Sequence, residues 1–529
     1  MMLYDAQRDV VIYNKIDPEP ILKHIPDARQ LCNGYLAVPA SLFNLQVLRF
    51  LGHSTIPPMK GKYDWPRSPF IQQPFNSQIV TSNFLALTPR SLVLSDMGTG
   101  KTLAALWASD FVMNLHPGTR CLIVAPLSTL QQVWADAIFS NFMGKRSCVV
   151  LHGSAEKRRK LLAEPHDFYI INHDGVGVGA SYRKGKFEFK GFSHDLLERS
   201  DIRMAIVDEI SAYRDGTTRR SRVARHILGR RDYFWGLTGT PTPNGPTDAY
   251  GIAKLVNNAF GESFVSYRQR VMTKISQFKW VPKPDAHLEA RKLLSPSIRF
   301  SLEDCVDLPP ITVQTRDVEM SDEQIKAWSD LKRELRLILD SGSNLTVANE
   351  AVLRAKLIQV SCGAIYDSEH RAHLVDYRPR LGVLREVIDE CGGKIIVFAP
   401  LTSVVNMLHH ALRKDYSVAV VTGAVGRVER GEIFRRFQQE RAPRVLVADP
   451  GTMAHGLNLE AAATICWYGP TDRTETYLQA NRRIRRPGQR QSQTIVQLAS
   501  NKIEREIFRR LAANESLQGI VLQLVREGE

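Results

Sequence analysis

Cysteine is scarce in this 529-residue chain, and its spacing excludes two kinds of fold. The seven cysteines form an odd set, and no two of them stand in a C-x-x-C pair. A disulfide framework needs an even set of cysteines, and a zinc ribbon needs closely spaced pairs. The sequence therefore predicts neither a disulfide-stapled domain nor a structural zinc site.

Long apolar runs are also missing from the sequence. No stretch reaches the roughly 18 consecutive apolar residues of a membrane-spanning helix. The first residues, MMLYDAQRDVVIY, carry Asp and Arg where a signal peptide has its apolar centre. We therefore expect no membrane segment and a location in the cytoplasm.

Acidic residues are outnumbered by basic ones. The chain has 55 Asp and Glu against 70 Lys and Arg, which gives a formal net charge of +15. An excess of this size favours a polyanionic partner, with nucleic acid as the first choice, and a generally basic surface is the alternative. Hydrophobic residues make up 43% of the chain, which is ordinary for a globular protein and excludes extensive disorder.

Turn-forming residues and apolar patterns divide the chain into four predicted parts, 1–65, 66–295, 296–375 and 376–529. The first part reads as a small N-terminal α+β module with a Ser-capped helix over 41–51. The second and fourth parts alternate short apolar runs with helical patterns, which is typical of parallel sheets with helical crossovers. The third part reads as an extended and helical linker. The predicted fold class is therefore α/β, with two parallel-sheet lobes.

The apolar runs between predicted helices mark the strands of the two lobes. Those of the first lobe are 91–95, 121–126, 148–152, 168–172, 204–209 and 233–239. Those of the second lobe are 394–400, 416–423, 444–450, 463–469 and 493–499.

A glycine-rich segment, S-D-M-G-T-G-K-T at 95–102, follows the first predicted strand and precedes a helical pattern. Glycines there let backbone N–H groups point into one anion-sized cavity at a helix N-terminus, as in a P-loop. Lys101 would reach the β- and γ-phosphates of ATP, and the Thr102 hydroxyl would hold Mg²⁺. Ser95 stands where the general pattern has its first glycine. The predicted phosphate-binding residues are Gly98, Thr99, Gly100, Lys101 and Thr102.

An acidic pair, Asp208 and Glu209, ends the apolar run at 204–209. A P-loop motor needs one carboxylate for Mg²⁺ and one to orient the attacking water. An isolated Asp-Glu pair is usually a solvated turn. Its place at the end of a buried strand, in a chain with a P-loop, favours the catalytic interpretation.

Further motifs follow one another along the chain. They are P-F-N-S-Q at 74–78, the P-loop, D-E-I-S at 208–211, L-T-G-T-P at 237–241, D-L-P-P at 307–310, M-S-D-E-Q at 320–324, G-L-N-L at 456–459 and Q-A-N-R-R-I-R-R-P-G-Q at 479–489. This order resembles the Snf2-like branch of superfamily 2 helicases, in a compact bacterial or phage form, over about residues 70–529. The resemblance implies two RecA-like lobes that share one ATP site.

The resemblance also implies roles for individual residues. Gln78 would contact the adenine, Asp208 would bind Mg²⁺, and Glu209 would orient the attacking water. Arg483 and Arg486, in the second lobe, would neutralise charge on the transferring phosphoryl group when the lobes close. Residues implied to link nucleotide state to nucleic acid are Gly239, Thr240, Thr452, Gly456 and Asn458, with Gly456 also expected at the nucleotide.

Three departures from the family pattern affect the coupling between lobes rather than hydrolysis. Ser211 replaces a His, residues 453–455 read Met-Ala-His before G-L-N-L, and Arg485 stands where His is frequent.

Candidate nucleic-acid contacts are small or basic residues in loops that follow predicted strands. They are Ser128, Thr129, His173, Thr240, Thr422, Gly423, Arg427, Thr452 and Asn458. The alternative for each is an ordinary helix cap or turn. Trp134, Trp235 and Trp467 lie in apolar runs, which predicts core packing rather than base stacking.

These observations predict an ATP- and Mg²⁺-dependent DNA translocase that acts on duplex or branched DNA with little sequence preference. A strand-separating helicase on DNA, or less readily on RNA, is the second hypothesis. A DNA-binding scaffold that uses ATP as a switch is the third, and the complete set of catalytic groups disfavours it. We expect a monomer in a bacterial cell, or in the host cytoplasm if a phage encodes it.

Overall fold

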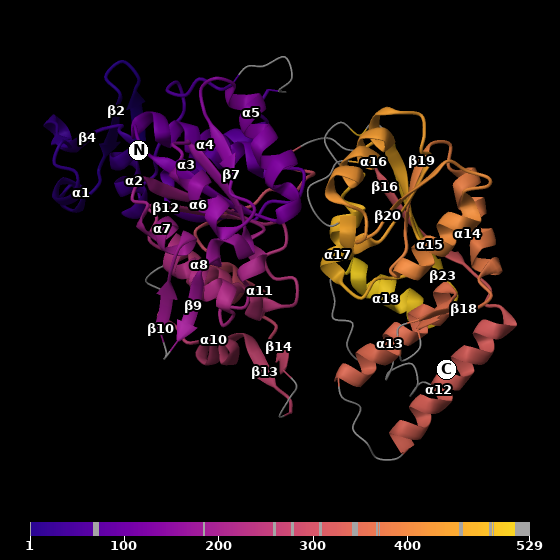
Figure 1. Cartoon of the computed structure of the whole chain (residues 1–529). Coiled ribbons are helices and arrows are strands. Elements are labelled where there is room, and N and C mark those ends of the chain that lie inside the picture. Colours follow the sequence, from indigo (N-terminus) through magenta and orange to yellow (C-terminus); the bar gives the residue numbers. More distant parts are fainter. Residues whose placement is uncertain are drawn as a thin grey trace. The chain divides into compact units, whose positions relative to one another are not determined.

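The computed structural model describes most of the chain. The described residues are 2–66, 73–183, 186–257, 261–276, 280–305, 309–340, 347–366, 369, 371–453, 459–485, 489 and 491–513. The chain divides by its internal contacts into two compact units, Met1–Cys305, drawn from indigo to magenta in Figure 1, and Val306–Glu529, drawn from there to yellow. Each unit is built around one large parallel sheet, so the predicted α/β class is confirmed.

The first residues form a sheet of four antiparallel strands with two helices. The elements are β1 (Met2–Asp5), β2 (Val10–Asn14), α1 (Glu19–His24), β3 (Arg29–Gln30), β4 (Tyr35–Pro39) and α2 (Leu42–Phe50), with the sheet order β1-β2-β4-β3. Ser41 caps α2, because its Oγ accepts a hydrogen bond from the Asn44 amide at 3.2 Å. Gln46 of the same helix donates to the Ala86 carbonyl at 2.7 Å, which attaches these residues to the rest of the first unit.

A seven-stranded parallel sheet forms the centre of the first unit, in the order β15-β5-β12-β11-β6-β8-β7. Its strands are β5 (Arg90–Val93), β6 (Arg120–Ala125), β7 (Cys148–Val150), β8 (Phe168–Asn172), β11 (Ile202–Asp208), β12 (Tyr233–Leu237) and β15 (Ser297–Ile298). Every run predicted as a strand in this lobe is a strand. β15 was not predicted, because two residues at a sheet edge carry no periodic pattern.

The remaining elements of the first unit are helices and two short hairpins. The helices are α3 (Asn76–Leu87), α4 (Lys101–Leu115), α5 (Asp136–Phe142), α6 (Ala155–Ala163), α7 (Phe192–Glu198), α8 (Arg219–Leu228), α9 (Ala249–Val256), α10 (Phe264–Val271) and α11 (Ala286–Leu293). The hairpins are β9 (Ala180–Arg183) with β10 (Lys186–Phe189), and β13 (Met272–Lys274) with β14 (Trp280–Pro282).

The buried helix α4 carries one carboxylate in its interior face. Asp110 is 1% exposed and accepts hydrogen bonds from Lys145 Nζ at 2.6 Å, Arg146 Nε at 2.8 Å and the Tyr63 hydroxyl at 3.0 Å. A buried carboxylate requires such partners to offset its desolvation. Asp110 therefore connects the segment before α3 to the loop after α5.

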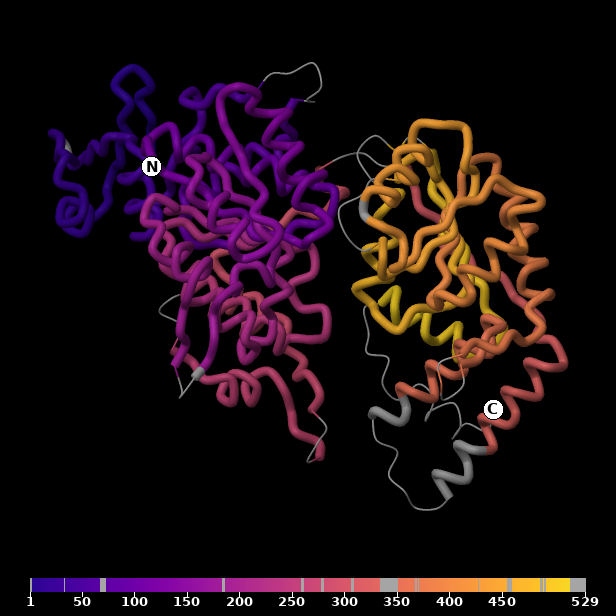
Figure 2. Tube along the Cα trace, viewed as in Figure 1, coloured from indigo at the N-terminus to yellow at the C-terminus, as the bar shows by residue number. Residues whose placement is uncertain are grey.

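The second unit has a six-stranded parallel sheet in the order β16-β23-β22-β19-β21-β20. Its strands are β16 (Ile311–Asp317), β19 (Lys394–Phe398), β20 (Val418–Val421), β21 (Val445–Ala448), β22 (Ala462–Trp467) and β23 (Gln493–Ala499), and β17 (Ala364–Tyr366) pairs with β18 (Ala372–Leu374) in a separate hairpin. The helices are α12 (Asp322–Asp340), α13 (Val347–Cys362), α14 (Arg378–Glu390), α15 (Thr402–Leu412), α16 (Arg427–Gln439), α17 (Thr474–Asn481) and α18 (Lys502–Ala512), and Figure 2 traces their course. The predicted linker 296–375 thus supplies an edge strand to each sheet, β15 to the first and β16 to the second.

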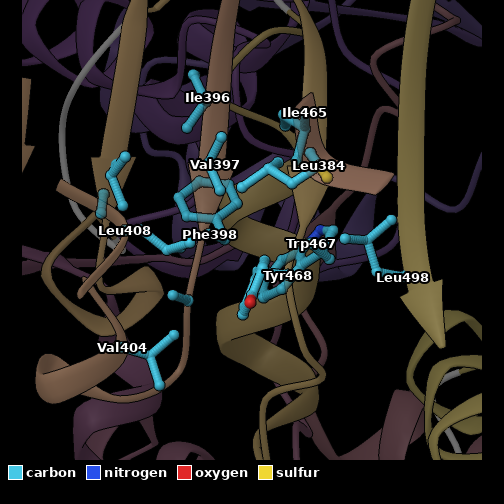
Figure 3. Packing of buried hydrophobic residues seen from close by; sticks show 14 of the residues in the cluster. Leu384, Ile396, Val397, Phe398, Val404, Leu408, Ile465, Trp467, Tyr468 and Leu498 are labelled. Atoms are coloured by element: carbon cyan, nitrogen blue, oxygen red, sulfur yellow. The ribbon is translucent and has the colours of Figure 1, made fainter. Parts of the chain in front are cut away.

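Aliphatic side chains make up most of the core of the second unit, and the aromatic residues Phe398, Trp467 and Tyr468 pack among them, as Figure 3 shows. The rings of Phe398 and Trp467 lie 4.9 Å apart, and Trp467 Nε1 donates to Asn481 Oδ1 at 2.8 Å. Trp134 and Trp235 are likewise fully buried in the first unit. The prediction of core packing for these three tryptophans is confirmed. None of the helices in the described part of the chain has the length and apolar character of a membrane span.

Candidate nucleotide site and nucleic-acid contacts

The predicted catalytic groups of the first unit lie at one edge of its sheet. The strands β5, β12, β11 and β6 are neighbours and run parallel, so their carboxyl ends share this edge. In open α/β sheets this is the edge at which ligands bind. The loops that meet there are 94–100, 238–241, 208–209 and 126–129.

The glycine-rich loop has the backbone conformation that its sequence predicts. Gly98 and Gly100 have φ values of 88° and 75°, which residues with a Cβ rarely adopt. Helix α4 begins directly after them, at Lys101. Lys101 Nζ donates to the carbonyls of Ser95 and Asp96, each at 2.8 Å. The ammonium group is thus held at the mouth of its own loop, beside the N–H groups of a helix N-terminus, where anions bind.

Ser95, which replaces the usual first glycine, has a structural partner. Its Oγ accepts a hydrogen bond from the Phe300 amide at 3.0 Å, and the Asp96 amide donates to the Phe300 carbonyl at 2.9 Å. Leu94 similarly donates to Ile298 at 2.8 Å. The segment that leaves the first unit is therefore hydrogen-bonded to the stem of the phosphate loop, and the serine adds one bond that glycine lacks.

Gln78, predicted to contact the adenine, packs against the phosphate loop. Its Oε1 accepts a hydrogen bond from the Phe75 amide at 2.8 Å, and its Nε2 lies 3.5 Å from the Gly100 carbonyl. A Cβ on Gly100 would lie only 1.9 Å from Gln78 Nε2, so a side chain there would displace the Gln78 amide, and the φ of 75° independently favours glycine. The adenine contact itself remains a prediction.

The acidic pair lies at the end of β11 in a strained turn. Glu209 has a φ of 49°, which lies in the left-handed region. For a residue other than glycine this backbone conformation costs on the order of 1 kcal/mol or more, and such strain is typical of functional sites. Asp208 Oδ1 accepts from the Glu209 amide at 3.1 Å, and Asp208 Oδ2 accepts from Trp134 Nε1 at 3.0 Å. Burial and the charge of Glu209 raise the pKa of Asp208, while the Trp134 hydrogen bond and the charge of Lys101 oppose this. A cation bound here would stabilise the ionised carboxylate further.

The donor set at this edge suits Mg²⁺ that is bound mainly through nucleotide phosphates. Such Mg²⁺ typically uses one or two carboxylates and keeps several oxygen ligands from phosphate and water. Asp208 supplies a carboxylate, and Thr102 supplies a hydroxyl in the first turn of α4. Among the residues that the structure describes, no group of three or more acidic, histidine or cysteine side chains forms an all-protein metal cage.

The L-T-G-T-P loop contacts the acidic pair through a threonine that sequence reasoning did not single out. Thr238 is fully buried, and its Oγ1 donates to Glu209 Oε2 at 3.1 Å and accepts from the Thr240 amide at 3.2 Å. Thr240, which was predicted to act in coupling, has no hydrogen-bond partner for its hydroxyl among the described residues. The motif itself was the available signal, but only the structure identifies which threonine touches Glu209.

The predicted nucleic-acid residues of the first unit differ in accessibility. Ser128 is half-buried, whereas Thr129 is buried and donates its hydroxyl to the Pro126 carbonyl at 2.9 Å. His173 is half-buried, and its Nδ1 lies 3.1 Å from the hydroxyl of Tyr213. Tyr213 follows the acidic pair by a few residues in the sequence. Ser128 and Thr129 follow β6, and His173 follows β8, so all three lie at the edge that holds the acidic pair.

In the second unit, Thr422 and Gly423 follow β20 and Thr452 follows β21. These strands are parallel neighbours, so the three residues share the carboxyl edge of the second sheet. The Thr452 hydroxyl donates to the Asp449 carbonyl at 2.7 Å, and Arg427 begins α16.

Of the two arginines predicted to act on the phosphoryl group, the structure describes Arg483 but not Arg486. Arg483 is fully buried, and its carbonyl accepts from the Leu459 amide at 3.2 Å. Arg486, Gly456 and Asn458 lie outside the described residues, so their predicted roles stay predictions.

The similarity of this chain to known families covers both units. Residues 77–362 match the SNF2-related domain, which is more than half of the chain, and residues 380–488 match the helicase conserved C-terminal domain. Putative protein p41 of Acyrthosiphon pisum secondary endosymbiont phage 1 is 25% identical over 75% of this chain and 84% of that protein.

Longer relatives match over the same region. The ISWI chromatin-remodeling complex ATPase ISW1 of Saccharomyces cerevisiae is 23% identical over 82% of this chain and 38% of its own length. The putative ATP-dependent helicase/translocase YwqA of Bacillus subtilis is 24% identical over 81% of this chain and 46% of its own length. This chain therefore spans less than half of the length of these two relatives.

A solved structure, the Sulfolobus solfataricus SWI2/SNF2 ATPase core in complex with dsDNA, aligns with 87% of this chain and 92% of its own, at 19% identity and a TM-score of 0.39.

The two domain matches follow one another along the chain, and the P-loop, the acidic pair and the L-T-G-T-P loop lie at one sheet edge. The chain therefore belongs to the SNF2-related family of superfamily 2 helicases, which are nucleic-acid-dependent ATPases.

Proposed function

We propose that this protein is an ATP-dependent DNA translocase that moves on, or remodels, duplex or branched DNA. The observation that carries the proposal is the meeting of Lys101, Asp208, Glu209 and Thr238 at one sheet edge, where hydrogen bonds join Asp208 to Glu209 and Glu209 to Thr238. This arrangement supplies a phosphate-binding cation, a metal-binding carboxylate and a carboxylate for the attacking water.

The residues of the first unit divide the work on ATP. Lys101 exchanges its loop carbonyls for phosphate oxygens, and Thr102 and Asp208 hold the cation. When bound there, Mg²⁺ would supply positive charge that neutralises the phosphates of ATP. Glu209 accepts a hydrogen bond from the attacking water, and Thr238 holds Glu209 Oε2 in place. By the family resemblance, we infer that Arg483 and Arg486 neutralise charge on the transferring phosphoryl group.

The choice of DNA rests on charge and on the family. A net charge of +15 suits a polyanion, and phosphate contacts carry little sequence information. Two longer relatives bear names that refer to chromatin remodelling and to helicase or translocase activity. We infer a duplex substrate, with strand separation as the second candidate.

The test is steady-state ATP hydrolysis with four matched effectors: duplex DNA, single-stranded DNA, forked DNA and RNA. We expect the strongest stimulation with duplex or forked DNA, and displacement of a third strand from a DNA triplex without separation of the duplex. Lys101→Ala serves as the inactive control. Hydrolysis that no nucleic acid stimulates would refute the proposal, and efficient separation of a labelled duplex would favour the strand-separating alternative.

A further inference from the structure

One short segment joins a candidate DNA contact to the acidic pair. After β6, residues Leu127–Thr129 form a 3₁₀ turn, and Leu130–Ala135 form a π-helix that continues into α5. π-helical turns are rare and occur frequently at functional sites. Leu127 is 46% exposed at one end of the segment, whereas Trp134 at the other end is fully buried.

The buried end of this segment holds the carboxylate of Asp208. Trp134 Nε1 donates to Asp208 Oδ2 at 3.0 Å, and the Glu209 amide donates to Asp208 Oδ1 at 3.1 Å. The indole N–H can only donate, so it stabilises the oxygen of an ionised carboxylate. With one donor on each oxygen, the plane of the carboxylate is fixed, and each oxygen retains acceptor capacity for a cation or water.

The indole itself is anchored by packing. Trp134 belongs to the same hydrophobic core cluster as Ile123 of β6 and Ile206 of β11. The segment also packs against β7 and β8. Because packing already fixes the indole ring, its N–H can donate a hydrogen bond without a further loss of side-chain conformational entropy.

We propose that Trp134 is a positioning residue that orients Asp208, and that the segment Leu127–Ala135 transmits DNA contact at the half-buried Ser128 to this carboxylate. The proposal rests on the proposed function, because it assumes that DNA binds near Ser128. The 3₁₀ turn, the π-helix and α5 follow one another without a break. We therefore expect a displacement of the turn at Leu127–Thr129 to reorient the indole slightly within its packed site.

The main variant is Trp134→Phe, which removes the N–H and keeps an aromatic ring. The matched control is Trp107→Phe, because Trp107 is also fully buried in the same core cluster and its Nε1 has no partner among the described residues. Both variants lose the same atoms from the same core. A difference between them therefore reports the hydrogen bond to Asp208.

Three measurements define the expected result. For Trp134→Phe, DNA-stimulated turnover falls by about 10-fold or more, which corresponds to the loss of one hydrogen bond to a charged group. The half-saturating Mg²⁺ concentration for binding of a fluorescent ATP analogue rises, and DNA affinity stays unchanged. Trp107→Phe behaves like the wild type in all three measurements. Equal behaviour of the two variants in turnover and Mg²⁺ dependence would overturn the proposal.

Two further experiments test the hydrogen bond between Trp134 and Asp208: a double-mutant cycle, and an isosteric replacement for use if Trp134→Phe is unstable. In an Asp208→Ala background, which has no side-chain acceptor for the indole N–H, Trp134→Phe should cause no further change in Mg²⁺-dependent nucleotide binding, whereas additive losses would contradict the proposal. If Trp134→Phe melts below the assay temperature, 3-benzothienylalanine at position 134 replaces the N–H by sulfur in a ring of the same size. It should reproduce the Mg²⁺ effect, and wild-type Mg²⁺ dependence would reject the proposal.

The two proposals fail in different ways. If the wild-type protein shows no DNA-stimulated hydrolysis, the proposed function is wrong, but the Mg²⁺ dependence of analogue binding still tests whether Trp134 orients Asp208. If stimulation is normal and Trp134→Phe lowers basal and DNA-stimulated turnover by the same factor, Trp134 does not transmit DNA contact. A larger loss of the stimulated rate supports that role.

Discussion

The contact between Thr238 and Glu209 makes a sharp prediction about hydrolysis. Thr238→Val removes the hydroxyl that donates to Glu209 Oε2 at 3.1 Å and that accepts from the Thr240 amide at 3.2 Å. Valine has nearly the same shape, so the fully buried site stays filled. The variant therefore isolates the two hydrogen bonds from packing.

The magnitude follows from what each hydrogen bond contributes. A hydrogen bond to a charged group is worth about 1.5–3 kcal/mol, and each 1.4 kcal/mol lost at the transition state slows turnover by about tenfold. We therefore expect kcat to fall by about 10- to 100-fold, because Glu209 no longer holds the attacking water in one orientation. Thr240 is half-buried, so water can replace part of its lost amide hydrogen bond, and we expect the melting temperature to fall by less than a few degrees.

The assay is steady-state hydrolysis at saturating ATP, Mg²⁺ and duplex DNA, with KM for ATP measured separately. KM should change far less than kcat, because Glu209 acts mainly on the transition state. The matched control is Thr88→Val at the other end of the same sheet, where the threonine hydroxyl has no partner among the described residues. If Thr238→Val turns over ATP as fast as Thr88→Val, the contact does not position Glu209.

A third variant separates the two threonines of the motif. Thr240→Val leaves the Thr238–Glu209 hydrogen bond intact, so basal hydrolysis should match that of the Thr88→Val control. A loss confined to DNA-stimulated turnover would support the coupling role that the sequence predicted for Thr240. A loss of basal hydrolysis as large as that of Thr238→Val would contradict the assignment made from the structure.

Four further predictions test other parts of the molecule. Lys101→Ala should abolish hydrolysis and leave the fold intact, and near-normal turnover would exclude a P-loop role. Arg486→Ala should keep ATP and DNA binding yet lower turnover by roughly 10³-fold, since an arginine finger acts on the transition state, and full recovery at saturating DNA would reject that role. DNA affinity should fall steeply as salt rises, with little dependence on base sequence, and a shallow salt slope would count against phosphate binding by the +15 chain. Glu504→Leu should destabilise the protein by about 3–5 kcal/mol in urea unfolding, because it leaves the fully buried Arg380 without the carboxylate that lies 2.8 Å away, and an unchanged midpoint would refute this.

The sequence alone determined the parts of this protein that depend on local patterns. Each apolar run that was predicted as a strand is a strand in one of the two sheets, because buried parallel strands are continuously apolar. The glycines at 98 and 100 and the lysine after them located the phosphate loop, because positive φ values and a helix N-terminus are written into a few adjacent residues. The family and the class of activity followed from the order of such motifs.

Only the tertiary structure decided which residues touch the catalytic groups. Trp134, in a π-helical turn, reaches Asp208, and Thr238, in the loop after β12, reaches Glu209. Both are distant in sequence from the acidic pair, and a tryptophan in an apolar run carries no signal beyond burial. The pairing of Ser95 with Phe300 likewise joins residues about 200 positions apart, and it turned an apparent defect in the phosphate loop into a hydrogen bond. Local sequence patterns report propensity and periodicity, whereas such contacts depend on the strand order of the sheet, which brings the carboxyl ends of β5, β12, β11 and β6 to one edge.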